Sequence, residues 1–239
     1  MKFFNTQDIG NLAHLYKINL INSCAGYKSA NLIATKSANT NTNVAIFSSV
    51  IHLGSAPPLL SFILRPSTVP RNTYENIKET GFYTINHIHK NILKDAHHTS
   101  AKYDNSISEF DITNLEQEYK NDFYAPFVKE SPIQIAMKYI EEYDIKANDT
   151  KLVIGEIQGL YINDELLEQD GFINLSKGKI ATINGLDGYA IPELQERFER
   201  QAIVTRTAFR TLGSVRTSGK KKERERSKRN LFWCWRKIF

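Results

Sequence analysis

The sequence predicts a mainly β protein with some α-helix, arranged as an antiparallel barrel with helices packed on or around it. Short runs rich in Ile, Val, Phe and Tyr recur along the chain, and Asn, Gly or Pro bounds them. The segments between these runs are short, which favours an antiparallel barrel over a layered parallel sheet. The 239 residues are 41% hydrophobic, enough for a domain with a substantial core.

The expected strands have β-branched and aromatic residues at their centres and turn residues at their ends. They cover residues 31–35, 43–53, 59–65, 82–88, 151–163 and 179–185. Between Lys36 and Arg65 lie 28 residues whose only titratable side chain is His52, a length that could span a bilayer. Polar residues and the Pro57-Pro58 pair interrupt this stretch in a way that a spanning helix does not tolerate. It therefore predicts two buried strands joined by a turn.

Helices are fewer, and we expect them over residues 73–81, 91–103 and 131–143. The first has Thr73 as a candidate N-cap and Gly81 as a C-terminal stop. The third places Ile133, Met137 and Ile140 at helical spacing.

The charge of the chain is distributed unevenly. From residue 200 onward there are 13 Lys and Arg against 2 acidic residues, a net charge of +11, whereas the preceding residues hold 18 basic and 24 acidic side chains, or −6. Residues 200–239 also lack apolar periodicity apart from a terminal aromatic cluster. We therefore expect one domain over residues 1–199, followed by a basic tail that is disordered or a solvated helix.

Cysteine usage and the N-terminus bear on the compartment. Cys24 and Cys234 are too few and too far apart in sequence to indicate a disulfide framework or a zinc site, which favours a reducing compartment. Asn5, Asp8 and Asn11 interrupt the N-terminal stretch where a signal peptide needs an unbroken apolar run. We expect a cytoplasmic protein.

Several common chemistries leave no motif in this sequence. There is no Gly-rich dinucleotide fingerprint after a strand, no P-loop and no G-x-S-x-G nucleophile elbow. His87 and His89 would face the same side of a strand and could hold a metal, but no Cys or H-x-x-x-H partner supports one. We expect no metal site, and His87, His89, His97 and His98 are then surface histidines or histidines that support other residues.

Arginine and hydroxyl side chains gather after the uncharged stretch. Arg65, Ser67, Thr68, Arg71 and Thr73 fall within nine positions, at the start of an expected helix. A helix N-terminus offers free N–H groups to a phosphate, and guanidinium and hydroxyl groups add donors. Upstream, over residues 28–49, small polar residues alternate with apolar ones. This pattern suits a flat ring with hydrogen-bonding edges, and equally a Ser/Thr-rich barrel wall. A polar-edged flat ring with a phosphate at one end describes flavin mononucleotide (FMN).

Several long stretches resemble the flavin reductase family, which has the FMN-binding split-barrel fold and includes flavoredoxin-like and ferric-reductase-like proteins. The ordered pattern is T-N-x-A-x-x-S-S, P-P-L, R-P, R-x-T-x-x-N-I and then a strand of the form G-x-(F/Y)-x-(I/V)-N. The resemblance covers roughly residues 8–198. It implies an antiparallel, Greek-key-like split β-barrel with flanking helices, FMN bound noncovalently, and a homodimer whose partner subunit helps to close the site.

The resemblance also assigns FMN contacts, position by position. Those expected to edge the isoalloxazine, largely through backbone groups, are Asn31, Asn43, Val44 and Ala45. Those expected to reach the ribityl or phosphate region are Ser48 and Ser49. The candidates for the phosphate are Arg65, Thr68, Arg71 and Thr73, with Lys36 as a further contact. In the competing interpretation, Arg71 and Thr73 only cap the helix and Lys36 is a solvated charge.

The function implied by the resemblance is hydride transfer from NADH or NADPH to flavin. The cofactor carries this chemistry, so no acid–base dyad is needed and no catalytic residue is assigned. Backbone N–H groups around residues 43–45 would stabilise the reduced flavin, and nicotinamide would enter near His87 or His97. An FMN-bearing electron carrier, reduced by another protein, is the alternative within the same fold.

The chain departs from the family after about residue 200, where relatives carry a Tyr-Ala-Arg-Pro-like motif. Three interpretations stay open: an appendage that binds anionic lipid or nucleic acid, a solvated tail without a partner, and the product of a shifted reading frame. The first leads to an alternative of another class, a basic-tailed module that binds nucleic acid or a membrane surface.

Overall fold

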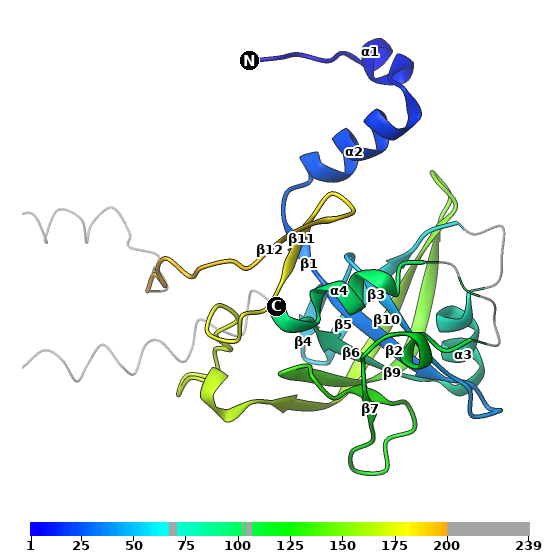
Figure 1. The fold of residues 1–239 in the computed structure, drawn as a ribbon, viewed down its shortest axis with the longest axis vertical. Coiled ribbons are helices and arrows are strands. Elements are labelled where there is room, and N and C mark those ends of the chain that lie inside the picture. The colour runs from blue at the N-terminus through cyan, green and yellow to red at the C-terminus, as the bar shows by residue number, and fades with distance from the viewer. Residues whose placement is uncertain (67–70, 102, 104–106, 200–239) are drawn as a thin grey trace, which may run out of the picture. The chain divides into compact units, whose positions relative to one another are not determined.

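The computed structural model describes residues 1–66, 71–101, 103 and 107–199 (Figure 1). The chain divides into two units, Met1–Leu194 and Gln195–Phe239, and the fold below is that of the first. The expected phosphate contact Thr68 and the expected tail over residues 200–239 lie outside the described residues.

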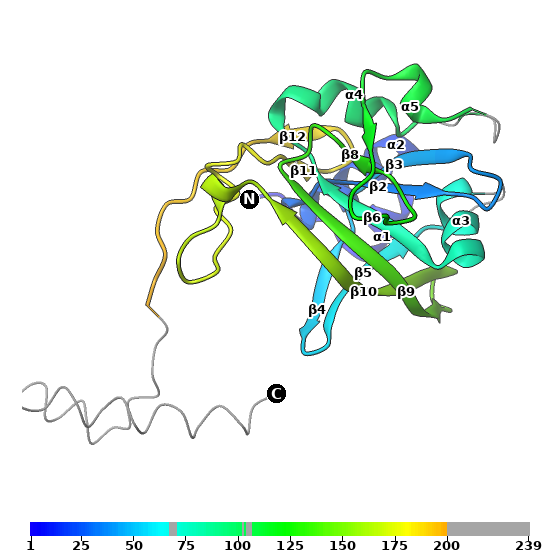
Figure 2. The same ribbon diagram turned by 90° about the horizontal axis from the view of Figure 1, so that it is seen from below.

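A seven-stranded antiparallel sheet, in the order β3-β2-β6-β9-β10-β5-β4, is the largest sheet of the first unit (Figure 2). Its strands are β2 (Asn31–Lys36), β3 (Thr42–Phe47), β4 (Ile51–Ser55), β5 (Pro58–Leu64), β6 (Phe82–His87), β9 (Ile133–Ile145) and β10 (Thr150–Ile162). The long β9–β10 hairpin changes register at two irregular positions, between Ile154 and Gly155 and between Ile157 and Gly159. Such bulges bend strands, which helps a sheet to curve into a barrel.

The two edges of this sheet are consecutive in the chain. β3 forms one edge and β4 the other, and residues 48–50 connect them. Ser49 fixes this connection to β5, because its hydroxyl both donates to the carbonyl oxygen of Ile63 and accepts from its N–H, at 3.1 Å each. Ser29 Oγ donates to the carbonyl oxygen of Val50 at 3.1 Å. The chain itself therefore bridges the opening between the sheet edges.

Two apolar clusters pack on the two faces of the sheet. The first includes Ile33, Phe62 and Tyr83, with edge-to-face ring contacts between Phe62 and Tyr83 at a centroid distance of 5.7 Å. The second includes Leu32 and Val44, from the alternate positions of β2 and β3. Alternation along a strand sends neighbouring side chains to opposite faces, so both faces of β2 are covered and all of Asn31–Thr35 is buried.

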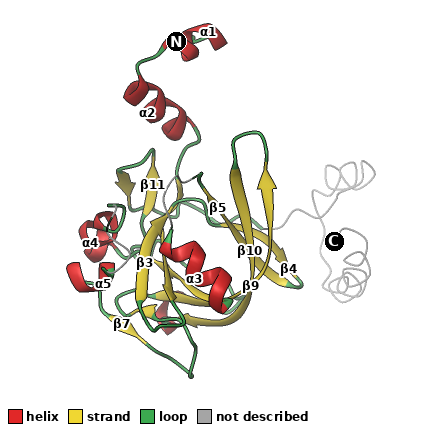
Figure 3. Cartoon of the chain, turned by 90° about the vertical axis from the view of Figure 1, so that its right-hand side faces the viewer, coloured by secondary structure: helices red, strands yellow, loops and turns green. Residues whose placement is uncertain are grey.

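Helices and smaller sheets surround the barrel. The helices are α3 (Asn72–Thr80), η1 (Lys90–Ile92), α4 (Leu93–His98), α5 (Glu109–Ile112) and η2 (Asp164–Leu166). The small strands are β1 (Lys28–Ser29), β11 (Thr182–Asn184) and β12 (Gly188–Ala190) in one sheet, and β7 (Gln117–Glu118) and β8 (Phe127–Val128) in another. Figure 3 shows α3 between β3 and the β9–β10 hairpin.

Two N-terminal helices, α1 (Thr6–Asn11) and α2 (His14–Cys24), contribute no buried residue (Figure 1). α1 begins with a capping box, in which the Asn5 side chain accepts from the Asp8 N–H and the Asp8 carboxylate accepts from the Asn5 N–H. The Asn5–Asp8 spacing is a helix-start signal in the sequence, but no helix is among those expected over this segment. Among the described residues, no helix is both long and apolar enough to cross a membrane.

Most expected strands are confirmed, but one of them is interrupted by a turn. The strand expected over residues 43–53 is two strands, because the chain turns at residues 48–50 to pass from one sheet edge to the other. The uncharged stretch thus holds three strands, and β4 is largely exposed, not buried. The strand expected over residues 179–185 is short, β11, preceded by an isolated bridge between His89 and Ile180.

The helix expected over residues 131–143 is wrong, since this segment is strand β9. Ile133 and Met137 fit a helical spacing, but with Ile135 between them they also alternate, and all three belong to one buried cluster. β9 pairs with β6 on one side and β10 on the other, and this pairing overrides the local pattern. The helix expected over residues 91–103 is realised in part, as η1 followed by α4.

The helix expected over residues 73–81 is α3, with a different start. Gly81 ends it as predicted, with a left-handed φ of 78°. The prediction that Thr73 is the N-cap is wrong, because Arg71 occupies that position. The Thr73 hydroxyl instead reaches across to β3.

Candidate cofactor site

Asn43 and Thr73 meet although 30 positions separate them in sequence. Asn43 lies on edge strand β3 and Thr73 in the first turn of α3, and both are buried. With its amide oxygen toward Thr73, Asn43 accepts from the Thr73 hydroxyl at 2.9 Å, and its nitrogen donates to Glu109 Oε2 at 3.3 Å. The fold thus brings one residue expected at the flavin ring next to one expected at the phosphate.

Glu109, at the start of α5, is the residue of this group that sequence reasoning missed. Its Oε2 accepts the backbone N–H of Val44 at 3.1 Å, so that N–H of the 43–45 segment is bonded within the chain. Burial raises the pKa of Glu109, and the N–H groups of Glu109 itself and Val44 offset this in part. The only sequence signal was an acidic residue after Ser108, a common pattern at a helix start.

The start of α3 has the features of an anion-binding helix end. Arg71 at the N-cap position makes no side-chain hydrogen bond to the helix, and its side chain is exposed. Arg71 therefore does not cap the first N–H groups of the helix, and the positive end of the helix dipole adds to their attraction for an anion. Glu75 in the same turn opposes an anion in part.

The other residues expected near the ribityl and phosphate groups lie outside α3. Arg65 follows the end of β5, is exposed, and donates from Nη2 to Asn22 Oδ1 of α2 at 3.1 Å. Ser49 uses its hydroxyl in the two bonds to Ile63, whereas Ser48, beside it, is half-buried. Lys36 places its ammonium over the rings of Tyr119 and Tyr124, at 5.1 and 4.8 Å from their centroids.

Asn31 has the least satisfied side chain among the expected ring contacts. It is 1% exposed, and neither its amide oxygen nor its amide nitrogen has a hydrogen-bond partner among the described residues. A buried amide without partners is costly, so such a group is a candidate for contact with a ligand or an ordered water. The register places Asn31 opposite Phe47 on β3 and His87 on β6, while Ala45 lies opposite Ile33.

The histidines expected near the nicotinamide lie on separate elements. Burial lowers the pKa of His87, on β6, to about 4, so this ring is neutral at neutral pH. His97, in α4, has Nδ1 2.9 Å from the hydroxyl of Tyr189 on β12, and burial with the nearby Asp187 raises the pKa of that tyrosine to about 12. Within the described residues, no group of three or more His, Cys, Asp or Glu could hold a metal ion.

Comparison with known proteins identifies this architecture. A crystal structure of a putative flavin reductase with a split barrel domain from Shewanella frigidimarina NCIMB 400 shares 45% sequence identity with the chain, at a TM-score of 0.81. The match covers 84% of this chain and 100% of that one. The fold is therefore a split β-barrel, as predicted.

More distant structures share the fold alone. Nitrilotriacetate monooxygenase component B from Bacillus cereus matches at 19% identity and a TM-score of 0.70, over 83% of this chain and 98% of its own. Flavoredoxin of Desulfovibrio vulgaris (Miyazaki F) matches at 21% identity and a TM-score of 0.62, over 74% of this chain and 92% of its own. No curated protein matches significantly.

The family model of the flavin reductase like domain matches residues 27–181. The chain belongs to this family, which confirms the resemblance found in the sequence.

Proposed function

We propose that this protein binds FMN and transfers a hydride to it from NADH or NADPH, as a flavin reductase. The observation that carries the proposal is the arrangement at α3. The N-cap residue Arg71 is exposed and makes no capping bond, and the Asn43–Thr73 hydrogen bond joins the first turn to the edge strand. The 45% identity to a putative flavin reductase over that protein's full length supports the same function.

The residues present fit FMN. The start of α3 and Arg71 offer donors and positive charge for the phosphate. The Asn31 amide, buried and without a partner, offers both a donor and an acceptor to a polar ring edge. When bound, FMN supplies the hydride-accepting ring, and the protein orients it and excludes water. Hydrogen bonds from Thr73 to Asn43 and from Asn43 to Glu109 link α3, β3 and α5 to one another beside these donors.

Anaerobic titration with NADH and with NADPH tests the proposal. Purified protein loaded with FMN should be yellow, and at least one nicotinamide should bleach it. A colourless protein that does not take up added FMN would overturn the proposal. A yellow protein that reacts with neither donor would instead favour the FMN-bearing electron carrier.

We also infer a homodimer. α2 exposes Leu15, Tyr16 and Ile21, with 73% of the Leu15 surface accessible, and α1 and α2 bury no residue within the chain. Burial of such side chains against a second copy would be favourable. Light scattering coupled to size-exclusion chromatography should give twice the chain mass, and a monomer mass at micromolar concentration would refute the dimer.

A further inference from the structure

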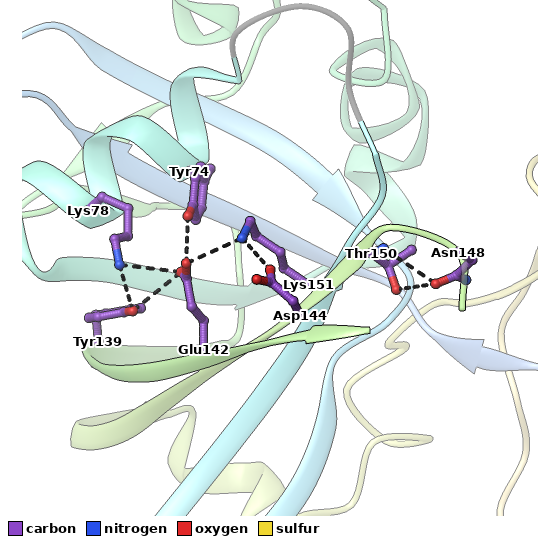
Figure 4. Close-up of polar contacts among 8 residues, drawn as sticks. All are labelled: Tyr74, Lys78, Tyr139, Glu142, Asp144, Asn148, Thr150 and Lys151. Atoms are coloured by element: carbon purple, nitrogen blue, oxygen red, sulfur yellow. Dashed lines mark hydrogen bonds and ion pairs between the residues drawn. The ribbon is translucent and has the colours of Figure 1, made fainter. Parts of the chain in front are cut away.

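A polar hub of five side chains connects α3 to the β9–β10 hairpin (Figure 4). Glu142 of β9 is its centre: the Tyr74 hydroxyl donates to Oε1 at 2.7 Å and the Tyr139 hydroxyl to Oε2 at 3.3 Å. Lys78 lies 3.4 Å and Lys151 3.6 Å from the same carboxylate. Only 18% of the Glu142 side chain is exposed, so solvent screens these contacts less than at an open surface.

Two of these contacts come from successive turns of one helix. Tyr74 lies in the first turn of α3 and Lys78 four residues later, so both project from the same face. Lys78 also donates to the Tyr139 hydroxyl at 2.7 Å. α3 is thereby held to β9 at two points along its axis, which restricts its rotation as well as its position.

The residues beside Tyr74 are those proposed to bind phosphate. Thr73 bonds to Asn43 of β3, and the next residue, Tyr74, bonds to Glu142 of β9. Consecutive residues thus attach the start of α3 to two strands that are not neighbours in the sheet. Arg71, at the N-cap, is three residues from Tyr74.

The same hub also reaches the end of β5, just before Arg65. Lys151 of β10 pairs in register with Leu64, the last residue of β5, and Arg65 follows Leu64 directly. Lys151 contacts Glu142 and also Asp144, at 2.5 Å. Glu142 therefore connects, through Lys151 and Tyr74, the strand that ends before Arg65 and the helix that starts after Arg71.

The hub is a brace and not a second anion site. Lys78 and Lys151 each face Glu142, and Lys151 faces Asp144 as well, so two positive and two negative charges balance. Burial alone would raise the pKa of Glu142, but the hydrogen bond from Tyr74 and the charges of Lys78 and Lys151 outweigh it, and its pKa is lowered. The carboxylate is thus charged at neutral pH and keeps both lysines engaged.

We propose that Glu142 is a positioning residue for FMN binding, which through Tyr74 and Lys151 sets the separation between the end of β5, before Arg65, and the start of α3, after Arg71. The inference rests on the proposed FMN binding. The hub should affect only the binding of the FMN phosphate, because the hub contacts the site through α3 and the end of β5. Riboflavin, which has the same ring and no phosphate, separates this effect from a general loss of stability.

The test compares the full-length wild type with Tyr74→Phe, which removes only one hydroxyl, and Glu142→Gln, which removes the charge. Asp144→Asn is the matched control, since Asp144 lies on the same strand and contacts Lys151 but forms no hydrogen bond or ion pair with α3 among the described residues. Dissociation constants for FMN and riboflavin are measured by fluorescence quenching. Both hub variants should bind FMN about 3- to 10-fold more weakly, with riboflavin affinity unchanged. Asp144→Asn should resemble the wild type.

Hydrogen–deuterium exchange gives a readout without ligand. Amides of residues 72–80 should exchange faster in Tyr74→Phe and Glu142→Gln than in Asp144→Asn. Equal weakening of FMN and riboflavin, or unchanged FMN affinity, would overturn the role of Glu142 while leaving FMN binding intact. Wild-type protein that binds neither flavin would overturn the proposed function and this inference with it.

Discussion

The Thr73 hydroxyl lies 2.9 Å from the Asn43 amide, and this bond joins helix α3 to the edge strand β3 at the candidate site. It connects the two segments from which the expected ring and phosphate contacts come. Because both side chains are buried, neither can exchange its partner for water without structural change. The bond is therefore a direct point at which to test the site.

Replacement of Thr73 by Val should lower the free energy of unfolding by about 1 kcal/mol and weaken FMN binding, because the Asn43 amide loses its donor in a buried position. Thr73→Ser keeps the hydroxyl and should retain most of the affinity. Thr80→Val, at the other end of α3, serves as the control, since Thr80 bonds to the Asn76 carbonyl oxygen and not to β3. FMN affinity that is equal in Thr73→Val and Thr80→Val would contradict the assignment.

His87 should make the protein sensitive to acid. Burial lowers its pKa in the folded state to about 4, below the ordinary 6.5, so the unfolded state binds the proton more tightly. The stability contributed by the neutral ring is present above pH 6.5 and is lost as the pH falls toward 4, by about 3 kcal/mol. Urea denaturation at a series of pH values should show a shallower loss for His87→Gln.

Substitutions at Gly155 and Tyr83 should have non-additive effects on stability. A Cβ at Gly155 would lie 2.1 Å from the Tyr83 hydroxyl oxygen and 3.0 Å from Cζ of the same ring. Gly155→Ala should therefore cost about 2 kcal/mol or more of stability. The Tyr83 hydroxyl is buried without a partner, so Tyr83→Phe alone should cost little and should recover part of the loss in the double variant. Additive losses in thermal denaturation would show that the two side chains do not clash.

Removal of residues 200–239 should leave FMN affinity unchanged, because the match to the family model ends at residue 181 and the expected FMN contacts lie over residues 31–73. If the tail binds anionic partners, the full chain should retain DNA or anionic vesicles at low salt and the shortened chain should not. Retention by neither protein would exclude this role, and loss of FMN binding on truncation would place part of the site in the tail.

The sequence predicted the barrel well because its strands carry local signals. β2, β5, β6 and β10 are dense in β-branched and aromatic residues, and turn residues flank them, so their existence did not depend on distant contacts. β9 was predicted as a helix because Ile133 and Met137 satisfy both periods, and only pairing with β6 and β10 decides between them. Local pattern cannot supply that information.

The candidate site was predictable in its residue types more than in its connections. The cluster of Arg and Thr near α3 was visible in the sequence, and the fold brings Thr73 to Asn43. Glu109 and Glu142 were not identified, because their roles arise from where α5 and β9 pack, far along the chain. Thr68 lies outside the described residues, and the individual FMN contacts remain predictions.

The connection at residues 48–50 links the two edge strands of the sheet covalently, so the circumference of the barrel depends on its length. Strands elsewhere in the sheet are held side by side by hydrogen bonds, but β3 and β4 are not paired with each other, and residues 48–50 join the end of one to the start of the other. Residues inserted there would let the two edges move apart and widen the mouth of the barrel. The same insertion at residues 146–149, at the tip of the β9–β10 hairpin, would leave the circumference unchanged.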